Sequence, residues 1–169
     1  MLVRHAQASD SESFQRESGR PDRERPLTSE GVRCNRFAAL GLAGLLQRVD
    51  HIWSSPYTRA LQTAEGVGES FERPVEMPAV LLPPWERATL EAWLDTRLSA
   101  GQTGILVGHE PDLSILLGAW LCGGVRRAPI PMEKGAACAL RVAGGFGPGT
   151  MKLIWKLPQY GLMKLSGVQ

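Results

Sequence analysis

The sequence has little that points to a membrane, a nucleic acid or a disulfide-stabilised domain. Its 19 Lys and Arg residues nearly balance 17 Asp and Glu residues, so the chain offers no basic excess for nucleic acid or anionic lipid. It lacks an apolar run long enough to span a membrane, and its N-terminus lacks the pattern of a signal peptide. Cys34, Cys122 and Cys138 are an odd set without paired spacing, which argues against a disulfide framework or a zinc site. We therefore expect a cytoplasmic protein without a cofactor.

The length of 169 residues, 43% of them hydrophobic, is suited to one domain, residues 1–169. Short apolar segments alternate with helical patterns along the chain. The expected strands are residues 1–3, 50–55, 104–108, 136–142 and 151–157, and the expected helices are residues 32–49, 57–71, 86–98 and 111–121. This alternation predicts an α/β fold with a mostly parallel sheet covered on both faces.

Two details of the N-terminal region carry further expectations. Three residues are few for a strand, so we hypothesise that the natural start lies upstream or that this strand is truncated. The polar segment 6–25 is expected to be a long loop with no core face, followed by Thr28 or Ser29 as a helix N-cap. A long loop after the carboxyl end of a strand is often functional in α/β domains.

Reactive side chains follow three of the expected strands. Arg4 and His5 end the first strand, Arg59 lies in the first turn of the helix after the second, and His109 ends the third. Ligands bind outside the carboxyl ends of the strands in open α/β sheets, so the four side chains can converge on one pocket. A cation is normally disfavoured at a helix N-terminus, and the place of Arg59 is explained if a phosphate binds there too.

Two arginines and two histidines are suited to phosphoryl transfer without a metal. Guanidinium groups present planar sets of N–H donors that match phosphate oxygens. Their charge lowers the pKa of a neighbouring histidine, which keeps one ring nitrogen free to attack phosphorus near pH 7. A second histidine can donate to the phosphoryl oxygens in the transition state. These residues predict a reaction through a covalent phosphohistidine.

Four ordered motifs also carry a resemblance to a known family. They are residues 2–6, residues 25–28 with Gly31, residues 54–64, and residues 107–111. Together they resemble the histidine phosphatase superfamily, and their order and the chain length are most similar to its small SixA-type phosphohistidine phosphatase branch. The resemblance implies a phosphoglycerate mutase-like, three-layer α/β/α sandwich. It also implies His5 as the nucleophile, Arg4 and Arg59 as the phosphate clamp, and His109 as the second histidine of the pocket.

The substrate depends on whether the pocket contains a carboxylic acid. Glu86 is the candidate for protonating an alkoxide leaving group, and the alternative is a solvated residue in the first turn of a helix. Without an acid, phosphohistidine is favoured because its protonated imidazole leaves easily. The predicted function is hydrolysis of phosphohistidine in a protein of the histidine phosphotransfer type. The alternatives are a phosphatase for small phosphate esters, with Glu86 as the acid, and an inactive phosphoprotein-binding module.

Two further residues are expected to bind the substrate. Arg25 precedes a helix start near the predicted pocket, and Ser54 lies at the end of the second strand. The hydroxyl groups of Ser54 and Ser55 either donate to the phosphate or satisfy backbone groups in the turn. The arginines between residues 16 and 25 are interpreted as solvated, and a basic rim for acidic phosphoproteins is the alternative.

Overall fold

A six-stranded mixed sheet forms the framework of the computed structural model, which describes residues 1–123 and 129–167. The strands are β1 (Leu2–Arg4), β2 (His51–Ser54), β3 (Val75–Glu76), β4 (Gly104–Gly108), β5 (Ala137–Val142) and β6 (Met151–Leu157). Their order across the sheet is β3-β2-β4-β1-β5-β6. The pairs β3–β2, β2–β4 and β4–β1 are parallel, whereas β5 is antiparallel to both of its neighbours. The predicted α/β class with a mostly parallel sheet is confirmed.

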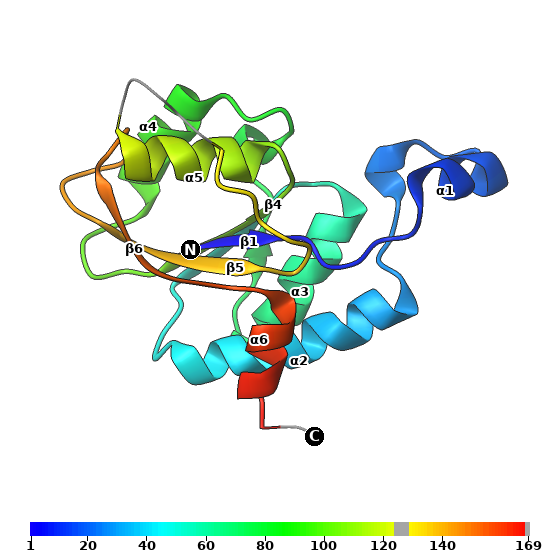
Figure 1. Ribbon diagram of the computed structural model, residues 1–169. Helices are drawn as coiled ribbons and strands as arrows, with labels where there is room; N and C mark the ends of the chain where they lie inside the picture. Colours follow the sequence, from blue (N-terminus) through cyan, green and yellow to red (C-terminus); the bar gives the residue numbers. More distant parts are fainter. Residues whose placement is uncertain (124–128, 168–169) are drawn as a thin grey trace.

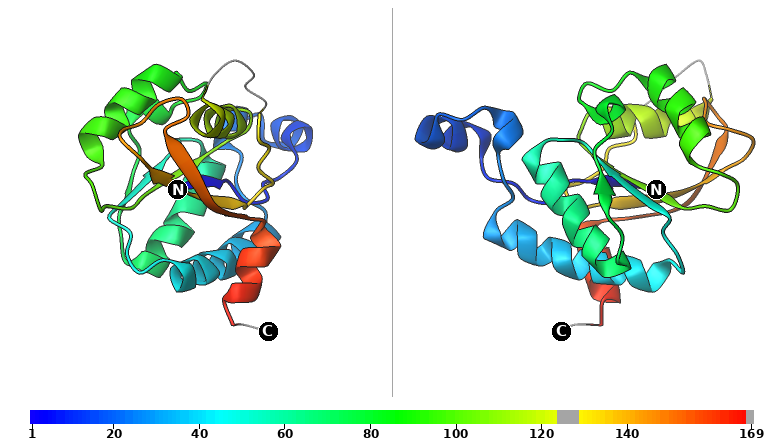
Figure 2. Two further views of the ribbon diagram at one scale, coloured as in Figure 1. Left: turned by 60° about the vertical axis from the view of Figure 1, so that its left-hand side comes forward. Right: turned by 180° about the vertical axis from the view of Figure 1, so that it is seen from behind.

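Helices cover both faces of this sheet. The covering helices are α2 (Ser29–Leu45), α3 (Thr58–Phe71), α4 (Arg87–Arg97), α5 (Asp112–Cys122) and α6 (Gln159–Leu165). A further helix, α1 (Ser11–Ser18), and the 3-10 turns η1 (Asp22–Glu24) and η2 (Ala79–Leu81) lie in the connections. Figures 1 and 2 show α4 and α5 on one side of the sheet and α2, α3 and α6 on the other, which is the expected three-layer sandwich. Within the described ranges, every helix is too short or too polar to cross a membrane.

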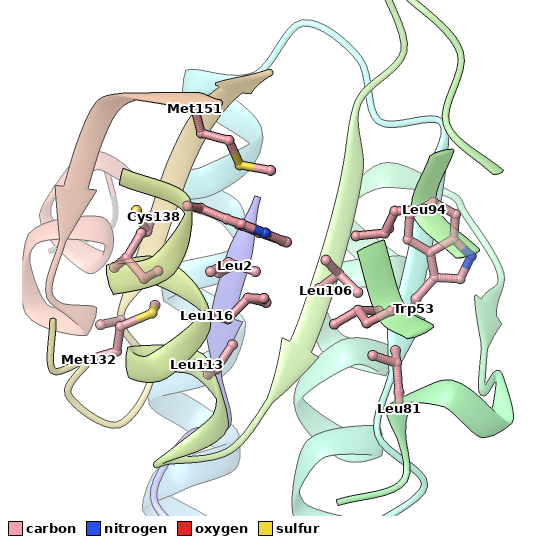
Figure 3. Packing of buried hydrophobic residues seen from close by; sticks show 14 residues of the cluster. Leu2, Trp53, Leu81, Leu94, Leu106, Leu113, Leu116, Met132, Cys138 and Met151 are labelled. Carbon is pink, nitrogen blue, oxygen red and sulfur yellow. The ribbon is translucent and has the colours of Figure 1, made fainter. Parts of the chain in front are cut away.

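The short strand β1 lies at the centre of the core. Neighbouring residues of a strand point to opposite faces of the sheet. Leu2 therefore packs with the residues of α4 and α5, and Val3 packs with those of α2 and α3. Figure 3 shows Leu2 and Leu106 of the sheet in one buried cluster with Leu113 and Leu116 of α5. All five residues of β4 are buried, as its unbroken apolar run predicts.

Helix α2 begins and packs through specific residues. The side chain of Thr28 accepts a hydrogen bond from the Gly31 N–H at 2.9 Å, so Thr28 is the N-cap, as predicted. A Cβ at Gly41 would overlap the carbonyl oxygen of Leu162, so this glycine lets α6 lie directly against α2. At Gly44 the nearest atom to such a Cβ lies 4.0 Å away, so this position is open.

The expectation of a loop without a core face over residues 6–25 is wrong in two respects. This segment contains α1 and η1, and Ala6 and Ala8 pack with Leu27 in a small buried cluster. Helix α1 forms because Asp10 caps its N-terminus and Gly19, with φ 67°, ends it in the left-handed conformation. Its sequence, SESFQRES, has Phe14 as its one apolar side chain, so no repeated apolar spacing indicates a helix, and none of its residues is buried. Figures 1 and 2 show α1 standing away from the sandwich.

Candidate active site

The carboxyl ends of three adjacent parallel strands bring the two histidines together. Strand β4 lies between β1 and β2, and the His5 N–H donates to the Gly108 carbonyl at 3.1 Å. The rings of His5 and His109 have centroids 5.1 Å apart and planes tilted by 52°. The two residues are only 6% and 5% exposed, so their side chains meet in a largely desolvated place.

The local contacts of His5 determine which ring nitrogen is free. Nδ1 lies 2.8 Å from the Ala6 carbonyl oxygen, which can only accept a hydrogen bond, so Nδ1 carries the proton and Nε2 carries a lone pair. The Ala6 N–H donates to the Thr63 hydroxyl at 3.0 Å, and that hydroxyl donates to the Arg59 carbonyl at 2.7 Å. The chain after His5 is thereby joined to the first turns of α3.

Burial and positive charge keep His5 neutral. Burial is the larger cause and, with the guanidinium charges of Arg59 and Arg4, it lowers the pKa of His5 to about 4, although the hydrogen bond to Ala6 partly offsets it. Near pH 7 the imidazole of His5 is therefore unprotonated at Nε2, which is the form that a nucleophile requires.

His109 is held through Ser55. Its Nε2 lies 2.9 Å from Ser55 Oγ, which also accepts a hydrogen bond from the Tyr57 N–H at 3.4 Å. If the Ser55 hydroxyl donates to Nε2, the proton of the neutral ring lies on Nδ1, which is buried without a hydrogen-bond partner among the described residues. Burial, and then the charge of Arg59, lowers the pKa of His109 to about 3.

Arg4 is fixed by the chain that precedes β5. Its Nη1 donates to the Met132 carbonyl at 2.6 Å, and the Met132 N–H donates to Glu110 Oε1 at 2.8 Å. The Gly135 N–H donates to the carbonyl oxygens of both Arg4 and His5. Arg4 Nε is buried and lacks a hydrogen-bond partner in the described part of the chain.

Arg59 enters the site from the first turn of α3 and is only 7% exposed. Its Nη1 donates to the Asp22 carbonyl at 2.9 Å and lies 3.1 Å from Asp22 Oδ2. Its Nε is buried and, within residues 1–123 and 129–167, unpartnered. The guanidinium lies 5.1 Å from the centre of the Tyr57 ring. Burial lowers the pKa of Arg59, which the neighbouring Asp22 partly opposes.

The structure brings Arg25 to the edge of this cluster through Asp22, a residue that the sequence analysis did not select. Arg25 Nε donates to Asp22 Oδ1 at 2.7 Å, and its Nη1 donates to the Ser9 carbonyl at 2.5 Å. The charge of Arg25 contributes to the lowered pKa of His5. Asp22 was missed because it lies in the segment assigned to a loop, although an acidic residue three positions before an arginine is a recognisable pairing signal.

The other arginines of this segment are paired with neighbouring glutamates. Arg16 lies 3.8 Å from Glu17, and Arg20 and Arg23 lie 2.8 Å and 3.9 Å from Glu24. These pairs are largely exposed, which fits the interpretation of solvated arginines better than that of a basic rim.

The hydroxyl of Ser54, an expected phosphate-binding group, is engaged by the backbone of the turn. It is buried and donates to the Ser55 carbonyl at 2.8 Å, so it satisfies a backbone group in the turn. Ser55, the other serine of this pair, contacts His109 instead. Successive side chains leave a strand on opposite sides, which explains why Ser55 and not Ser54 contacts His109.

Glu86 is the N-cap of α4. Its carboxylate accepts hydrogen bonds from the N–H groups of Ala88 and Thr89, at 3.1 Å and 2.6 Å. The hydrogen bonds from Thr89 are the largest cause of its lowered pKa, and the side chain is exposed. The carboxylate is thus ionised and engaged by the helix, which is the solvated first-turn arrangement considered above.

No cluster of three or more His, Cys, Asp or Glu side chains with the geometry of a metal site occurs in the part of the chain that the structure describes. The positive groups around His5 are the guanidinium groups of Arg4, Arg59 and Arg25.

Comparisons with known proteins give a consistent result. A profile of the histidine phosphatase superfamily (branch 1) matches residues 1–81. The phosphohistidine phosphatase SixA of Escherichia coli (strain K12) is 33% identical over 106 residues. That match covers 61% of this chain and 65% of the relative, which is less than two thirds of its length.

Solved structures resemble nearly the whole chain. The protein histidine phosphatase SixA complexed with tungstate is similar with a TM-score of 0.77 and 26% identity, over 95% of this chain and 97% of that one. A phosphoserine phosphatase mutant from Entamoeba histolytica, in complex with phosphoserine, has a TM-score of 0.67 at 15% identity over 95% and 97% of the two chains. The similarity to the phosphoserine phosphatase, at this low sequence identity, shows a shared fold.

Proposed function

Because the chain belongs to the histidine phosphatase superfamily, we propose that it is a phosphatase that hydrolyses phosphohistidine in another protein. One observation carries the proposal. His5 has a lone pair on Nε2, and the charges of Arg59 and Arg4, whose Nε groups are buried and unpartnered among the described residues, help to lower its pKa. A nucleophile next to two desolvated N–H donors of positive charge is suited to a phosphoryl group.

The first step is transfer of the phosphoryl group to His5. Nε2 attacks phosphorus, the N–P bond of the substrate breaks, and the substrate imidazole leaves with the proton that it already carries. Arg4 and Arg59 bind the phosphoryl oxygens, and His109 donates its Nδ1–H to an oxygen as charge shifts in the transition state. The Nδ1–H of His5 stays on the Ala6 carbonyl, which holds the ring in the attacking orientation.

The second step returns His5 to its starting form. Water attacks the phosphorus of phospho-His5, an O–P bond forms, and the N–P bond breaks with its electron pair returning to Nε2. Inorganic phosphate leaves with the oxygen and both protons of the water, as dihydrogen phosphate, and His5 keeps its proton on Nδ1. We propose that the reaction needs no metal ion, because two guanidinium groups and His109 supply the donors that stabilise the transferring group.

The position of Glu86 supports phosphohistidine over alkyl phosphate esters. An alkoxide leaving group needs an acid, and the carboxyl of Glu86 has a lowered pKa and caps α4. A protonated imidazole needs none. We propose a partner of the histidine phosphotransfer type and a cytoplasmic reaction, the latter supported by the three unpaired cysteines.

The test compares hydrolysis of an aryl phosphate by the wild type and by His5→Ala, both with EDTA. We expect activity in the wild type only. His51→Ala is the matched control, because His51 is the first residue of β2, at the end of the strand opposite the candidate site, where its ring stacks on Trp53. Parallel assays with a phosphohistidine protein and with sugar phosphates test the substrate class. Preference for the sugar phosphates, or loss of activity with EDTA, would contradict the proposal.

A further inference from the structure

We propose that Asp22 is a positioning residue that holds the guanidinium of Arg59 in the orientation required to bind phosphate. The inference rests on the phosphate site of the proposed function and goes beyond it by naming what organises that site. Asp22 lies in η1, a separate element from β1, α3 and the end of β4, which supply the four principal side chains. It reaches the site only because the segment with α1 and η1 returns to the first turn of α3.

Among the described residues, Asp22 supplies the hydrogen bond and the ion pair of the Arg59 guanidinium, which also lies over the Tyr57 ring. Arg59 Nη1 donates to the Asp22 carbonyl at 2.9 Å and lies 3.1 Å from Oδ2 of the same residue. The other carboxylate oxygen, Oδ1, accepts hydrogen bonds from Ser11 Oγ and Arg25 Nε, both at 2.7 Å. The carboxylate therefore lies between two arginines whose charges repel each other, and a neighbouring hydroxyl fixes its own orientation.

Because a guanidinium is planar, the contact between Asp22 and Arg59 Nη1 fixes the orientation of the whole group. The N–H donors of arginine lie in one plane, so holding Nη1 fixes the direction of the remaining donors. Arg59 Nε is buried and, among the residues that the structure describes, unpartnered. Arg4 has the same arrangement. Its Nη1 donates to the Met132 carbonyl, and its Nε is also buried and unpartnered among the described residues. In both arginines one terminal nitrogen is anchored and the inner N–H is left for the ligand.

Asp22 is ionised in this setting. Partial burial raises the pKa of its carboxyl group, but the hydrogen bonds from Ser11 and Arg25 and the charge of Arg59 outweigh that effect and lower the pKa. None of the residues of η1 is buried, so Asp22 does not contribute to the core. Its substitution should therefore affect the orientation of Arg59 more than the stability of the fold.

The experiment measures binding of inorganic phosphate by calorimetry, together with kcat and KM for an aryl phosphate. The variants are Asp22→Asn and Asp22→Ala, and Glu24→Gln is the matched control. Glu24 lies in the same turn but pairs with Arg20 and Arg23, so its variant should match the wild type. The expected result for Asp22→Ala is about tenfold weaker binding of phosphate or more, with a similar rise in KM and a smaller change in kcat.

Asp22→Asn separates positioning from a purely structural role. It keeps the backbone carbonyl and one side-chain acceptor, so the segment should stay folded, but it loses the charge that faces Arg59. We expect an unchanged temperature of thermal unfolding with weaker phosphate binding. Equal or tighter phosphate binding by Asp22→Asn would overturn the proposal, because it would mean that the carboxylate competes with the ligand. The binding measurement needs no turnover, so it stands apart from the test of phosphatase activity.

Discussion

The pairing of β1 with β4 sets the distance between His5 and His109. Arg4 lies opposite Gly108 in this parallel pair, so the two histidines leave the sheet as adjacent residues of neighbouring strands. Their ring centroids are 5.1 Å apart. The relation between the proposed nucleophile and the proposed donor is therefore a property of the central sheet, where β1 and β4 are buried, and does not depend on a surface loop.

The donor role of His109 predicts a graded response to substitution. His109→Ala removes the proposed N–H donor to the transferring group, and we expect kcat to fall by about 100-fold. His109→Gln retains an N–H donor of similar reach and should lose less. Steady-state kinetics with an aryl phosphate measures both variants. Equal kcat values in the wild type and His109→Ala would show that this ring does not act in the chemical step.

The two buried histidines predict a fold that loses stability in acid. Burial first, and then neighbouring charges, lowers the pKa values from 6.5 to about 4 for His5 and about 3 for His109. Below about pH 6.5 the unfolded chain binds protons that the folded protein does not bind until about pH 4. The free energy of unfolding is therefore highest above pH 6.5. It declines as the pH falls toward the folded-state pKa values, by about 1.4 kcal/mol per histidine for each pH unit.

Urea unfolding at several pH values between about 7.5 and 4.5 measures this decline. The matched variant combines His5→Gln and His109→Gln, which removes both titrating rings and should flatten the dependence on pH. An unchanged slope in that variant would assign the acid sensitivity to other groups.

The chain of contacts behind Arg4 predicts a role for Glu110. Its carboxylate accepts the N–H of Met132, whose carbonyl holds Arg4 Nη1. Glu110→Ala leaves that N–H without its acceptor, so we expect Arg4 to lose its anchor and KM for an aryl phosphate to rise about tenfold. Glu110→Gln keeps an acceptor oxygen at the same position and should stay close to the wild type. The prediction is refuted if the two variants have the same KM.

Two glycines of α2 give a matched test of helix packing. Alanine at Gly41 would meet the Leu162 carbonyl, so we expect Gly41→Ala to lower the free energy of unfolding by about 2 kcal/mol. Gly44 faces open space, and Gly44→Ala should raise it by up to about 1 kcal/mol because alanine favours the helix. Denaturant unfolding compares the two. Similar effects from both changes would mean that α6 is not packed against α2 as described.

Much of the fold could be predicted because buried elements leave a periodic apolar pattern. Helix α5 follows such a pattern, and the unbroken apolar run of β4 predicts a strand buried on both faces. Helix α1 has no such pattern, since it is held by its caps and buries none of its residues. Helix α6 and strand β3 were also not expected, because seven and two residues are too few to establish a period. In α2, Leu40 and Leu45 are exposed, so the apolar residues of this helix do not all belong to its buried face.

The candidate site also contains residues that the sequence could predict and residues that it could not. The proximity of Arg4, His5 and His109 could be predicted because they lie at the ends of strands that meet at the same edge of a parallel sheet. Asp22 reaches the site through a segment without a core pattern, and its place depends on the path of that segment. Met132 contacts Arg4 through its backbone carbonyl. Every residue has this group, so the sequence could not predict the contact.

The phosphoenzyme is the most direct test of the account. The protein is incubated with a labelled phosphorylated substrate, denatured in base, and digested for mass spectrometry. The account predicts a base-stable, acid-labile phosphoryl group on His5 in the wild type, which is absent in His5→Ala and present in His51→Ala. Full hydrolytic activity in His5→Ala, or a label on any residue other than His5, would contradict the central claim.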